Sequence, residues 1–452
     1  MSSARRSSKL SSPTLPSFDK ASALVAAYAA KLARRRPAAE RVRLNQALGR
    51  VLAEPLRADT DQPLFPRSTR DGFACRVAEA CSHRPLVVAG STRAGQTPSG
   101  PLPCGAVWEI MTGAPVPTGA DAVIMLEHVE DSDTRAGKSS SKSTRTIRLL
   151  PPRTIRKGEN IVARAAQARK GEELLSVGAS IAAAQIALAA SCGITTLKVF
   201  LKPRVAILST GDELVPIHAT PGPSQIRNSS SAMLAAMVSA AGGNAWILPI
   251  ARDTAKSLDA ALARATSADL LLITGGVSAG KFDLVEPALI RAGARFHFTG
   301  VRIQPGKPLV FGEMPRRSTG LNQNGPRGDQ NGAKRCFVFG LPGNPVSSAV
   351  TFLLFAAPIV AALAGRSARG TNGALGPLFA LARLTKDVKT KTGLTRFLPA
   401  ACTFAGPTPE VALVPWQGSG DLAAMARANC FLVVPEDADR LPAGSTVRIL
   451  LS

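Results

Sequence analysis

The sequence predicts a multidomain protein built of α/β and β domains, and three observations support this fold class. The chain has 452 residues, more than one hydrophobic core usually supports, so about two to four domains are expected. Between residues 204 and 365, short apolar runs alternate with helical stretches, as in parallel strands joined by crossover helices. On either side of this region, short apolar runs separated by Pro and Gly predict β structure.

The N-terminal part is predicted to contain two helices around a β region. Residues 19–36 have the periodicity of an amphipathic helix, and Pro37 is expected to end it. Residues 56–149 show the β pattern. Residues 179–190 have helical composition, and Pro203 marks the entry to the α/β region.

The α/β region is predicted to alternate between strands and helices. Strands are expected at 205–208, 245–249, 270–274, 295–301 and 337–339, with helices at 230–241, 255–265 and 283–292. Residues 313–334 are expected to form a disordered basic insertion on a hairpin between 309–311 and 336–339. Residues 341–365 carry no charge and could span a membrane by length, but Pro358 and the LPGNP opening favour a core helix.

The C-terminal part is predicted to be a small β domain that follows a Gly- and Ala-rich linker at 365–376. Its strands are expected at 397–404, 411–414, 431–434 and 447–451.

The net charge of +24 indicates anionic partners such as phosphates, nucleotides, oxyanions or nucleic acid. Much of this charge lies in residues 1–9, 135–156 and 316–335, whose Ser, Gly and Asn content is typical of solvated loops. Small anions are therefore favoured over nucleic acid.

The seven cysteines form no CxxC pair and are odd in number, which fits reduced cytosolic thiols. No His or Cys pair stands at the spacing of a zinc or iron site. The first twenty residues lack the apolar core of a secretory signal, so a cytoplasmic location and no membrane partner are expected.

Four glycine-rich loops follow predicted strands of the α/β region. They read STGDEL at 209–214, TGGVSAGKFD at 274–283, QPGKP at 304–308 and LPGNP at 341–345. Ligands of open α/β sheets bind beyond the carboxyl ends of the strands, and glycine lets backbone N–H groups converge on an anion. Each loop alone could be an ordinary turn, but together they favour a shared oxyanion site.

Polar side chains in these loops have the chemistry of such a site. Ser278 and Ser347 offer hydroxyl donors, while Lys281 and Lys307 offer positive charge. The residues that could hold Mg²⁺ beside substrate phosphates are Asp212, Glu213 and Asp283.

A nucleotide-binding P-loop is a competing interpretation, because residues 275–281 fit GxxxxGK after an apolar strand. Phe282 stands where the Mg²⁺-binding hydroxyl is needed, and Pro287 is expected to interrupt the following helix, so this interpretation is less favoured. Outside the α/β region, ordinary turns explain the glycines of residues 67–74 and 109–127. They do not explain why Asp71 and Thr112 stand there.

In this order along the chain, the strings DGFA, IMTGAPVPTGADAV, STGDEL, TGGVSAGKFD, PGKP, LPGNPVS and GSGDLAAMARAN resemble the MoeA/gephyrin E-domain family of molybdopterin molybdenumtransferases. The resemblance covers residues 17–452. It implies an elongated homodimer. Each chain is expected to begin with a disordered basic tail at 1–16. The implied domains are a split helical and β domain I at 17–59 and 152–198, an inserted β domain II at 60–151, a MogA-like molybdopterin-binding α/β domain III at 199–368 and a C-terminal β-barrel domain IV at 374–452.

The resemblance also implies a reaction. Adenylylated molybdopterin and molybdate would give molybdenum cofactor and AMP in the presence of Mg²⁺, with transient contact to a molybdopterin adenylyltransferase and to acceptor molybdoenzymes. Two alternatives stay open: a MogA-type molybdopterin adenylyltransferase, and a gephyrin-like scaffold without catalysis.

Site residues follow from the matching motifs. The resemblance assigns catalytic positions to Asp71, Thr112, Glu213, Asp253 and Asp283, with the first two supplied by the partner subunit. Residues expected to contact the substrate are Thr210, Gly211, Asp212, Asn228, Gly275, Gly276, Ser278, Lys307, Pro342, Gly343, Asn344, Pro345, Ser347 and Ser419.

The chain departs from the family pattern at several of these motifs. PRSTRDGFA at 66–74 lacks the first Asp of DNSAMDGYA and brings in Arg67 and Arg70. Gln304 stands where many members have Lys, Asn160 where Asp is frequent, and Pro399 where some members have Arg. The preference between molybdate and tungstate is therefore left open.

Overall fold

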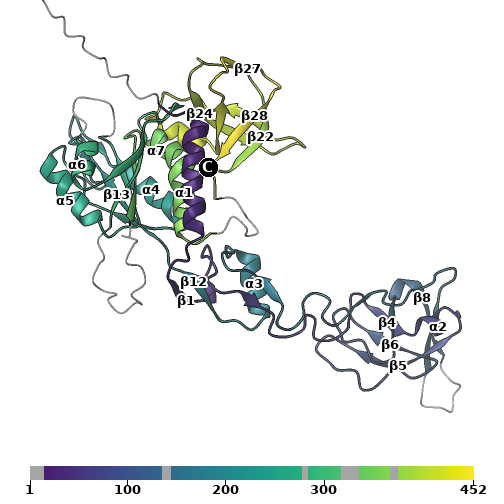
Figure 1. Cartoon of the computed structure of the whole chain (residues 1–452). Helices are drawn as coiled ribbons and strands as arrows, with labels where there is room; N and C mark the ends of the chain where they lie inside the picture. Colours follow the sequence, from purple (N-terminus) through teal and green to yellow (C-terminus); the bar gives the residue numbers. More distant parts are fainter. Residues whose placement is uncertain (1–14, 135–143, 277–283, 317–334, 367–374) are drawn as a thin grey trace, which may run out of the picture. The chain divides into compact units, whose positions relative to one another are not determined.

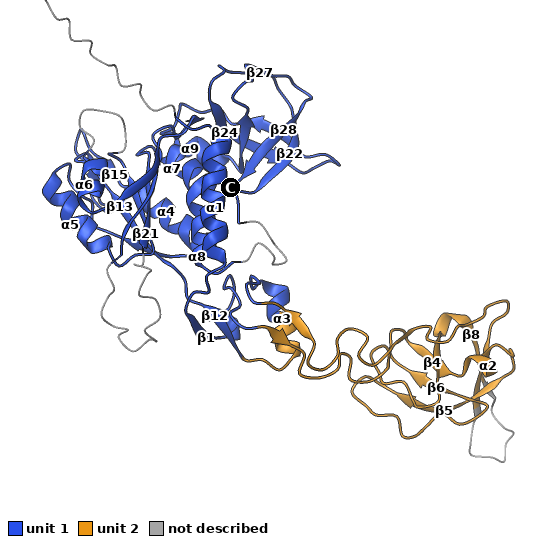
Figure 2. Cartoon of the chain, viewed as in Figure 1, with its two compact units in different colours: residues 1–54, 177–186, 196–452 blue, residues 55–176, 187–195 orange. Residues whose placement is uncertain are grey.

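A computed structural model describes residues 15–134, 144–276, 284–316, 335–366 and 375–452 of the chain (Figure 1). The chain forms two compact units (Figure 2). Unit 1 contains residues 1–54, 177–186 and 196–452, and unit 2 contains residues 55–176 and 187–195.

Unit 1 is built on a six-stranded sheet. Its strand order is β16 (Asn244–Ile247), β13 (Arg204–Ser209), β17 (Leu270–Thr274), β21 (Arg335–Leu341), β20 (Val310–Pro315) and β18 (Arg295–Thr299). The first four strands are mutually parallel, which confirms the predicted crossovers. β20 pairs antiparallel with both neighbours, so it alone in this sheet runs the opposite way.

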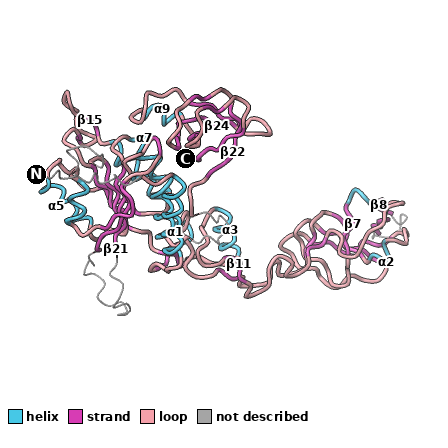
Figure 3. The backbone as a smooth tube through the Cα atoms, turned by 45° about the horizontal axis from the view of Figure 1, so that its top comes forward, coloured by secondary structure: helices cyan, strands magenta, loops and turns pink. Residues whose placement is uncertain are grey.

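Helices cover both faces of this sheet (Figure 3). α1 (Phe18–Ala33), α4 (Ser229–Ala240), α7 (Pro345–Thr351) and α8 (Ala357–Leu363) pack on one face; α5 (Ala255–Ala265) and α6 (Val285–Arg291) pack on the other. Val205 and Ile207 of β13 belong to the first core, whereas Ala206 and Leu208 belong to the second. This alternation explains why the strand is apolar throughout.

α1 begins and ends close to its predicted bounds. Its N-cap Ser17 accepts a hydrogen bond from the backbone N–H of Lys20 at 3.3 Å. The helix ends at Ala33 rather than at residue 36, because Leu32 is its last buried side chain and an exposed basic run follows before Pro37.

The uncharged stretch is a core helix, as predicted. α7, a π-helical segment η3 (Phe352–Ala356) and α8 follow each other without a break. Among the described residues, this is the one helix that meets the length and hydropathy of a membrane span, and 83% of its apolar window is buried inside the protein.

The C-terminal segment forms a closed five-stranded barrel, so the predicted β barrel is confirmed. Its strand order is β24 (Thr395–Thr403), β25 (Glu410–Leu413), β22 (Phe379–Leu384), β28 (Thr446–Leu451) and β26 (Cys430–Val434), and β26 pairs with β24 to close the ring. β19 (Ile303–Gln304) adds to β24 in parallel. Elements that the sequence did not predict are β22, β23 (Val388–Lys389), β27 (Arg440–Leu441) and α9 (Leu422–Arg427).

Short elements complete unit 1. β1 (Ala39–Arg43) pairs with β12 (Thr196–Phe200), and β14 (Leu214–Val215) pairs with β15 (Ile226–Arg227). η1 (Leu44–Gln46) is a single 3₁₀ turn. α3 (Ala183–Ser191) begins four residues later than predicted; its residues 183–186 belong to unit 1 and its residues 187–191 to unit 2.

Unit 2 is dominated by a second six-stranded sheet, which confirms the β prediction for this region. Its order is β7 (Ala122–Met125), β4 (Gly72–Cys75), β6 (Ala106–Ile110), β5 (Leu86–Thr92), β9 (Thr144–Leu149) and β8 (Val129–Thr134). The remaining elements are α2 (Val77–Ala80), η2 (Leu126–His128) and the strand pairs β3 (Arg67–Ser68) with β10 (Ile161–Val162) and β2 (Leu56–Arg57) with β11 (Glu173–Leu175).

Three local predictions were wrong. Pro287 does not interrupt a helix: it lies in the first turn of α6, where its missing N–H is not needed. Residue 16 is no free tail, because the Pro16 carbonyl accepts a hydrogen bond from Arg302 N at 2.9 Å. Residues 313–315 belong to β20 rather than to an insertion.

Several predicted segments lie outside the described residues. These are most of the tail at 1–14, the basic segment at 135–143, the insertion from 317 to 334 and the linker from 367 to 374. The division into four domains at the boundaries given above stays a prediction.

Gly72 tests whether the DGFA motif is needed for folding. A Cβ at this residue would overlap the carbonyl oxygen of Ile124 on the neighbouring strand. We expect Gly72→Ala to lower the free energy of unfolding of unit 2 by about 1–3 kcal/mol. Urea unfolding followed by Trp108 fluorescence, in a chain with Trp246 and Trp416 replaced by Phe, measures this change.

Gly100→Ala is the matched control, because a Cβ there would meet no atom within 4 Å. Equal stability of the two variants would contradict the assigned strand approach.

Candidate functional site

The loops after β13, β17 and β21 leave the sheet at one edge. Ser209 is aligned with Thr274, and Thr274 with Leu341, in adjacent parallel strands. Gly275 N lies 3.4 Å from the carbonyl oxygen of Leu341, to which it donates a hydrogen bond. The predicted convergence of the STGDEL, TGG and LPGNP loops is therefore observed for their described residues.

Glycine is required at two of the positions where these loops touch, Gly275 and Gly276. Gly275 has a φ of +86°, and a Cβ there would lie 2.5 Å from the carbonyl oxygen of Thr210. Gly276 has a φ of +59°, and its Cβ would approach Val285. A Cβ on Gly343 would lie 3.5 Å from the Cα of Gly275. Backbone atoms of three loops are thus packed directly against one another.

Four buried polar side chains form a network beneath the loops. The Ser209 hydroxyl lies 3.1 Å from Asn228 Oδ1, 2.8 Å from Ser231 Oγ and 2.9 Å from Thr274 Oγ1. Asn228 Nδ2 donates to Ser231 Oγ at 2.8 Å. Because an amide oxygen can only accept, Ser209 donates to Asn228 and accepts from Ser231 and Thr274, which fixes the direction of every bond.

Three acidic residues and an arginine lie beside this edge. Asp253 N donates to Asp212 Oδ1 at 3.4 Å, and Arg252 Nη1 donates to the Asp212 carbonyl at 3.1 Å. The carboxylate of Glu213 folds back over Gly211, where it would overlap an added Cβ. Asp212, Glu213 and Asp253 are all exposed.

The C-terminal barrel supplies a residue to the LPGNP loop. Asn344 Nδ2 donates to Ser419 Oγ at 2.7 Å, and Val346 N donates to the Ser419 carbonyl at 3.1 Å. The hydroxyl of Ser348 donates a hydrogen bond to the carbonyl of Pro342. Ser347 is only 4% exposed, so it is the least accessible of the predicted hydroxyl donors at this loop.

The QPGKP loop packs against α7. A Cβ on Gly306 would lie 2.5 Å from the Thr351 side chain, and the exposed Lys307 follows directly. Gln304 Oε1 accepts a hydrogen bond from Arg396 Nε at 2.9 Å. Gln304, which stands where many members of the resembled family have Lys, therefore lies beside the guanidinium of Arg396.

Predicted site residues that this edge of unit 1 brings together are Thr210, Gly211, Asp212, Glu213, Asn228, Asp253, Gly275, Gly276, Pro342, Gly343, Asn344, Pro345, Ser347 and Ser419. Ser278, Lys281 and Asp283 lie outside the described residues, so their predicted roles stay predictions.

Asp71 and Thr112, in unit 2, form a pair. Asp71 Oδ1 accepts from the backbone N–H of Thr112 at 2.6 Å and from its hydroxyl at 2.9 Å. These two bonds, the backbone bond first, hold the pKa of Asp71 below its ordinary value. These bonds are a structural role for both residues, and they favour the ionised form of the exposed Asp71 carboxylate.

Asn160 positions the loop that carries Asp71. Its φ of +60° lies in the left-handed region, which Asn tolerates better than most residues. Its Nδ2 donates to the Val123 carbonyl at 2.8 Å, and its carbonyl accepts from Thr69 N at 2.9 Å. An amide suits this position because the Val123 carbonyl needs a donor, which an ionised Asp lacks.

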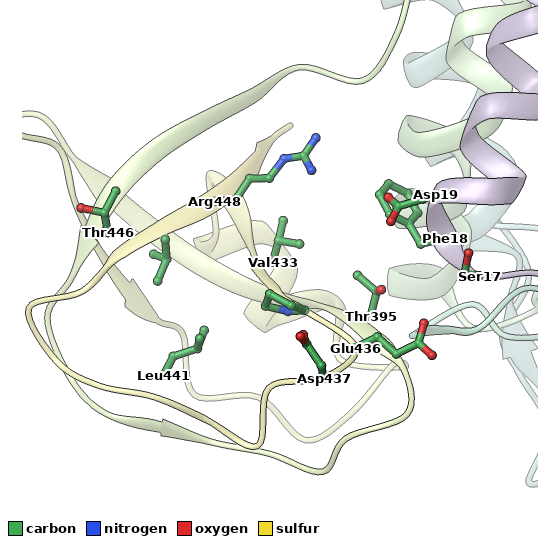
Figure 4. A pocket seen from close by; sticks show the side chains of 12 residues that line it. Ser17, Phe18, Asp19, Thr395, Val433, Glu436, Asp437, Leu441, Thr446 and Arg448 are labelled. Carbon is green, nitrogen blue, oxygen red and sulfur yellow. The ribbon is translucent and has the colours of Figure 1, made fainter.

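A separate cavity of about 340 Å³ lies between the start of α1 and the barrel (Figure 4). Asp19, Glu436, Asp437 and Arg448 line it, and Glu436 pairs with Arg302 at 3.0 Å. None of the predicted site residues lines this cavity.

Sequence reasoning missed Arg252, Arg396 and the hydroxyls of Ser209, Ser231 and Thr274. Their partners are far away in the chain; Ser209 and Thr274 are 65 residues apart. The only signal in the sequence is that each lies next to a predicted loop or strand end.

The arrangement is suited to binding an oxyanion. The exposed backbone at Gly276 and Gly343 and the exposed Lys307 offer donors, while Asp212 and Glu213 offer oxygen ligands to a divalent cation. Among the described residues of this edge, no Cys or His supplies a nucleophile.

Comparisons with known proteins agree with this geometry. Three protein-family models match the chain: MoeA N-terminal region (domain I and II) over residues 16–193, probable molybdopterin binding domain over 206–362 and MoeA C-terminal region (domain IV) over 381–452.

Named relatives match over most of their length. A molybdopterin molybdenumtransferase of Nostoc sp. is 32% identical over 91% of this chain and 88% of that protein. One of Bacillus subtilis is 32% identical over 91% and 89%. The crystal structure of a MoeA molybdopterin biosynthesis protein from Pyrococcus horikoshii is 29% identical, with a TM-score of 0.68 over 97% of this chain and 99% of that one.

Thr112→Val tests the pair in unit 2. Valine keeps the backbone N–H but removes the hydroxyl, so we expect the pKa of Asp71 to rise toward its ordinary value. Carboxyl ¹³C NMR titration, assigned with Asp71→Asn, measures it. Since the folded-state pKa is depressed, the pair stabilises unit 2 above the unfolded pKa, and this stabilisation is lost as pH falls through the folded pKa.

The control is Thr118→Val, another exposed threonine of unit 2. A pKa of Asp71 that stays unchanged in Thr112→Val would show that the hydroxyl makes no such bond.

Proposed function

The chain belongs to the MoeA family of molybdopterin molybdenumtransferases, and we propose that it inserts molybdate into adenylylated molybdopterin with release of AMP. The observation that carries this proposal is the convergence of three glycine-rich loops and barrel residue Ser419 on one edge of the α/β sheet. Both substrates are oxyanions, and such an edge offers the donors that they need.

The proposed roles follow from position. Backbone N–H groups of Gly276 and Gly343 bind phosphate or molybdate oxygens, and Lys307 adds positive charge. Asn344 and Ser419 hold the LPGNP loop in place through their 2.7 Å hydrogen bond. No covalent intermediate with the protein is required, because donors and charge suffice to stabilise the transfer.

Mg²⁺ fits the residues of this edge. Magnesium usually takes one or two carboxylates together with substrate phosphates and water, so it needs no cage of three protein ligands. Among the described residues, no group of three candidate ligands is found, but exposed Asp212 and Glu213 on one loop meet the smaller requirement. Asp283 is the proposed third ligand. Bound there, the ion would neutralise charge on the phosphate that leaves.

We further propose a cytoplasmic homodimer. In it, the partner subunit's Asp71 and the partner subunit's Thr112 complete the site, and the low pKa of Asp71 keeps its carboxylate charged. Molybdopterin adenylyltransferase and acceptor molybdoenzymes are the proposed transient partners.

The two alternatives have less support. A MogA-type adenylyltransferase would use the α/β region alone, whereas the named relatives match this chain over 91% of its length. A gephyrin-like scaffold would not require the contacts among the glycine-rich loops.

We expect the purified chain to release AMP from adenylylated molybdopterin when Mg²⁺ and molybdate are present. Glu213→Gln should lower this rate by on the order of 100-fold, because it removes a charge from the transfer site. Glu410→Gln, on the barrel surface, is the control and should keep full activity. An unchanged rate in Glu213→Gln would remove this residue from the site.

Subunit mixing tests the shared site. Asp71→Asn and Glu213→Gln chains should each be nearly inactive alone. Mixed by denaturation and refolding, they should recover about a quarter of wild-type activity, because half of the dimers are then mixed and each has one intact site. No recovery, with mixed dimers detected by mass spectrometry, would place both residues in a site built from one subunit.

A further inference from the structure

One buried arginine of the barrel has no acidic partner. Among the described residues, the buried arginines are Arg50 and Arg396, each 9% exposed. Arg50 pairs with Glu40 at 2.5 Å, whereas Arg396 forms no ion pair with any described residue. Glu436, in the barrel loop after β26, is instead paired with Arg302 at 3.0 Å. A buried charge without a counter-ion is costly, and an anion that binds beside it removes this cost.

The partners of the Arg396 guanidinium are all neutral oxygens. Its Nε donates to Gln304 Oε1 at 2.9 Å. Its Nη1 donates to the carbonyls of Lys391 and Leu394, the latter at 3.1 Å. No described residue accepts a hydrogen bond from Nη2. These bonds hold the guanidinium in place without neutralising its charge.

The bond from Arg396 fixes the orientation of the Gln304 amide. The two residues are paired in register between β19 and β24. Because a guanidinium can only donate, Gln304 must turn its oxygen toward Arg396, and its amide nitrogen is directed away from it. Gln304 is exposed, and no described residue accepts a bond from this nitrogen. The amide nitrogen is therefore an available donor.

The QPGKP loop lies close to the oxyanion edge. Gly306 packs against the side chain of Thr351, the last residue of α7. Thr351 follows Pro345, the first residue of that helix, by six residues. At 1.5 Å per residue, this places the loop roughly 9 Å along the helix from the LPGNP loop. An anion bound at the LPGNP loop is thus within range of the charges on Arg396 and Lys307.

We propose that Arg396 is a positioning residue for an oxyanion of the substrate, an inference that rests on the proposed function. It directs the amide nitrogen of Gln304 toward an anionic oxygen. Its own charge, which no carboxylate neutralises, strengthens that hydrogen bond. The ligand chemistry is a tetrahedral oxyanion, which molybdate and the phosphate of the adenylylated substrate have in common.

A purely structural clamp is the competing interpretation. In it, Arg396 only ties the QPGKP loop to the turn at residues 391–394. A carboxylate at residue 304 separates the two interpretations, because it keeps the bond to Arg396 while neutralising the charge. The clamp would then hold as well or better, whereas the oxyanion would lose a donor and meet a negative charge.

Gln304→Glu makes this change with little alteration of side-chain shape. Isothermal titration calorimetry with molybdate and, separately, with AMP measures the affinity for each anion. The Kd of at least one of them should rise about tenfold or more, while the melting temperature should not fall. A loss confined to molybdate assigns Gln304 to the metal oxyanion, and one confined to AMP assigns it to the phosphate.

Gln46→Glu is the matched control, because it changes the net charge equally at an exposed glutamine of η1. It should leave both affinities unchanged. Equal affinities of the unmodified chain and Gln304→Glu for both anions would overturn the proposal.

A rescue experiment gives a second test. Arg396→Gln should raise the KM of the affected substrate in AMP release more than it lowers kcat. Adding Gln304→Lys returns a cation to this loop and should recover most of the lost affinity. A clamp would not be recovered, because a lysine at residue 304 cannot rebuild the bonds to the carbonyls of Lys391 and Leu394. No recovery in a double variant whose circular dichroism matches the unmodified chain would overturn the proposal.

Failure of the proposed function is a separate result. The unmodified chain would then release no AMP from adenylylated molybdopterin, whereas the titrations of Gln304→Glu with molybdate and AMP would still decide the role of Arg396. Those titrations also cover the case in which Arg396→Gln does not fold, since residue 304 is exposed.

Discussion

The close approach of three loop backbones at the carboxyl edge of the sheet is the constraint on which the site depends. Gly275 lies so close to Thr210 that a Cβ would overlap its carbonyl oxygen, whereas a Cβ on Gly343 would lie at van der Waals contact with Gly275. Beneath it, the hydroxyl of Ser209 joins β13, β17 and α4 through bonds whose directions are all fixed. These contacts position the described loop backbone without a ligand, which lowers the ordering cost of binding.

The sequence predicted the α/β region well because its buried strands are apolar on both faces and are separated by clear helices. The β22 strand was missed because only two of its six residues, Ala382 and Leu384, are fully buried. Sequence also predicted which loops meet, since parallel strands end at the same edge. It could not predict Arg252 over Asp212 or Arg396 on Gln304, because such contacts depend on the packing of segments distant in the chain.

In unit 2, Asp71, for which we propose a functional role, also has a local structural role. Asp71 accepts two hydrogen bonds from Thr112, which orders the turn and favours the ionised carboxylate. Asn160 fixes the same turn from the other side. A substitution at Asp71 therefore changes both the charge and the shape of this loop, and the two effects are separated only by varying Thr112 as well.

The reversed strand β20 has a consequence for how the gene can change. Since β21 ends at the edge that carries the glycine-rich loops, its first residue, Arg335, lies at the opposite end of the sheet, and so does Pro315 at the end of β20. The chain between them leaves and re-enters the domain at its far side. Extra codons gained there, or an affinity tag grafted there, would lengthen the protein without reshaping the edge that carries the glycine-rich loops, so this hairpin is a permissive point for evolutionary drift and for labelling.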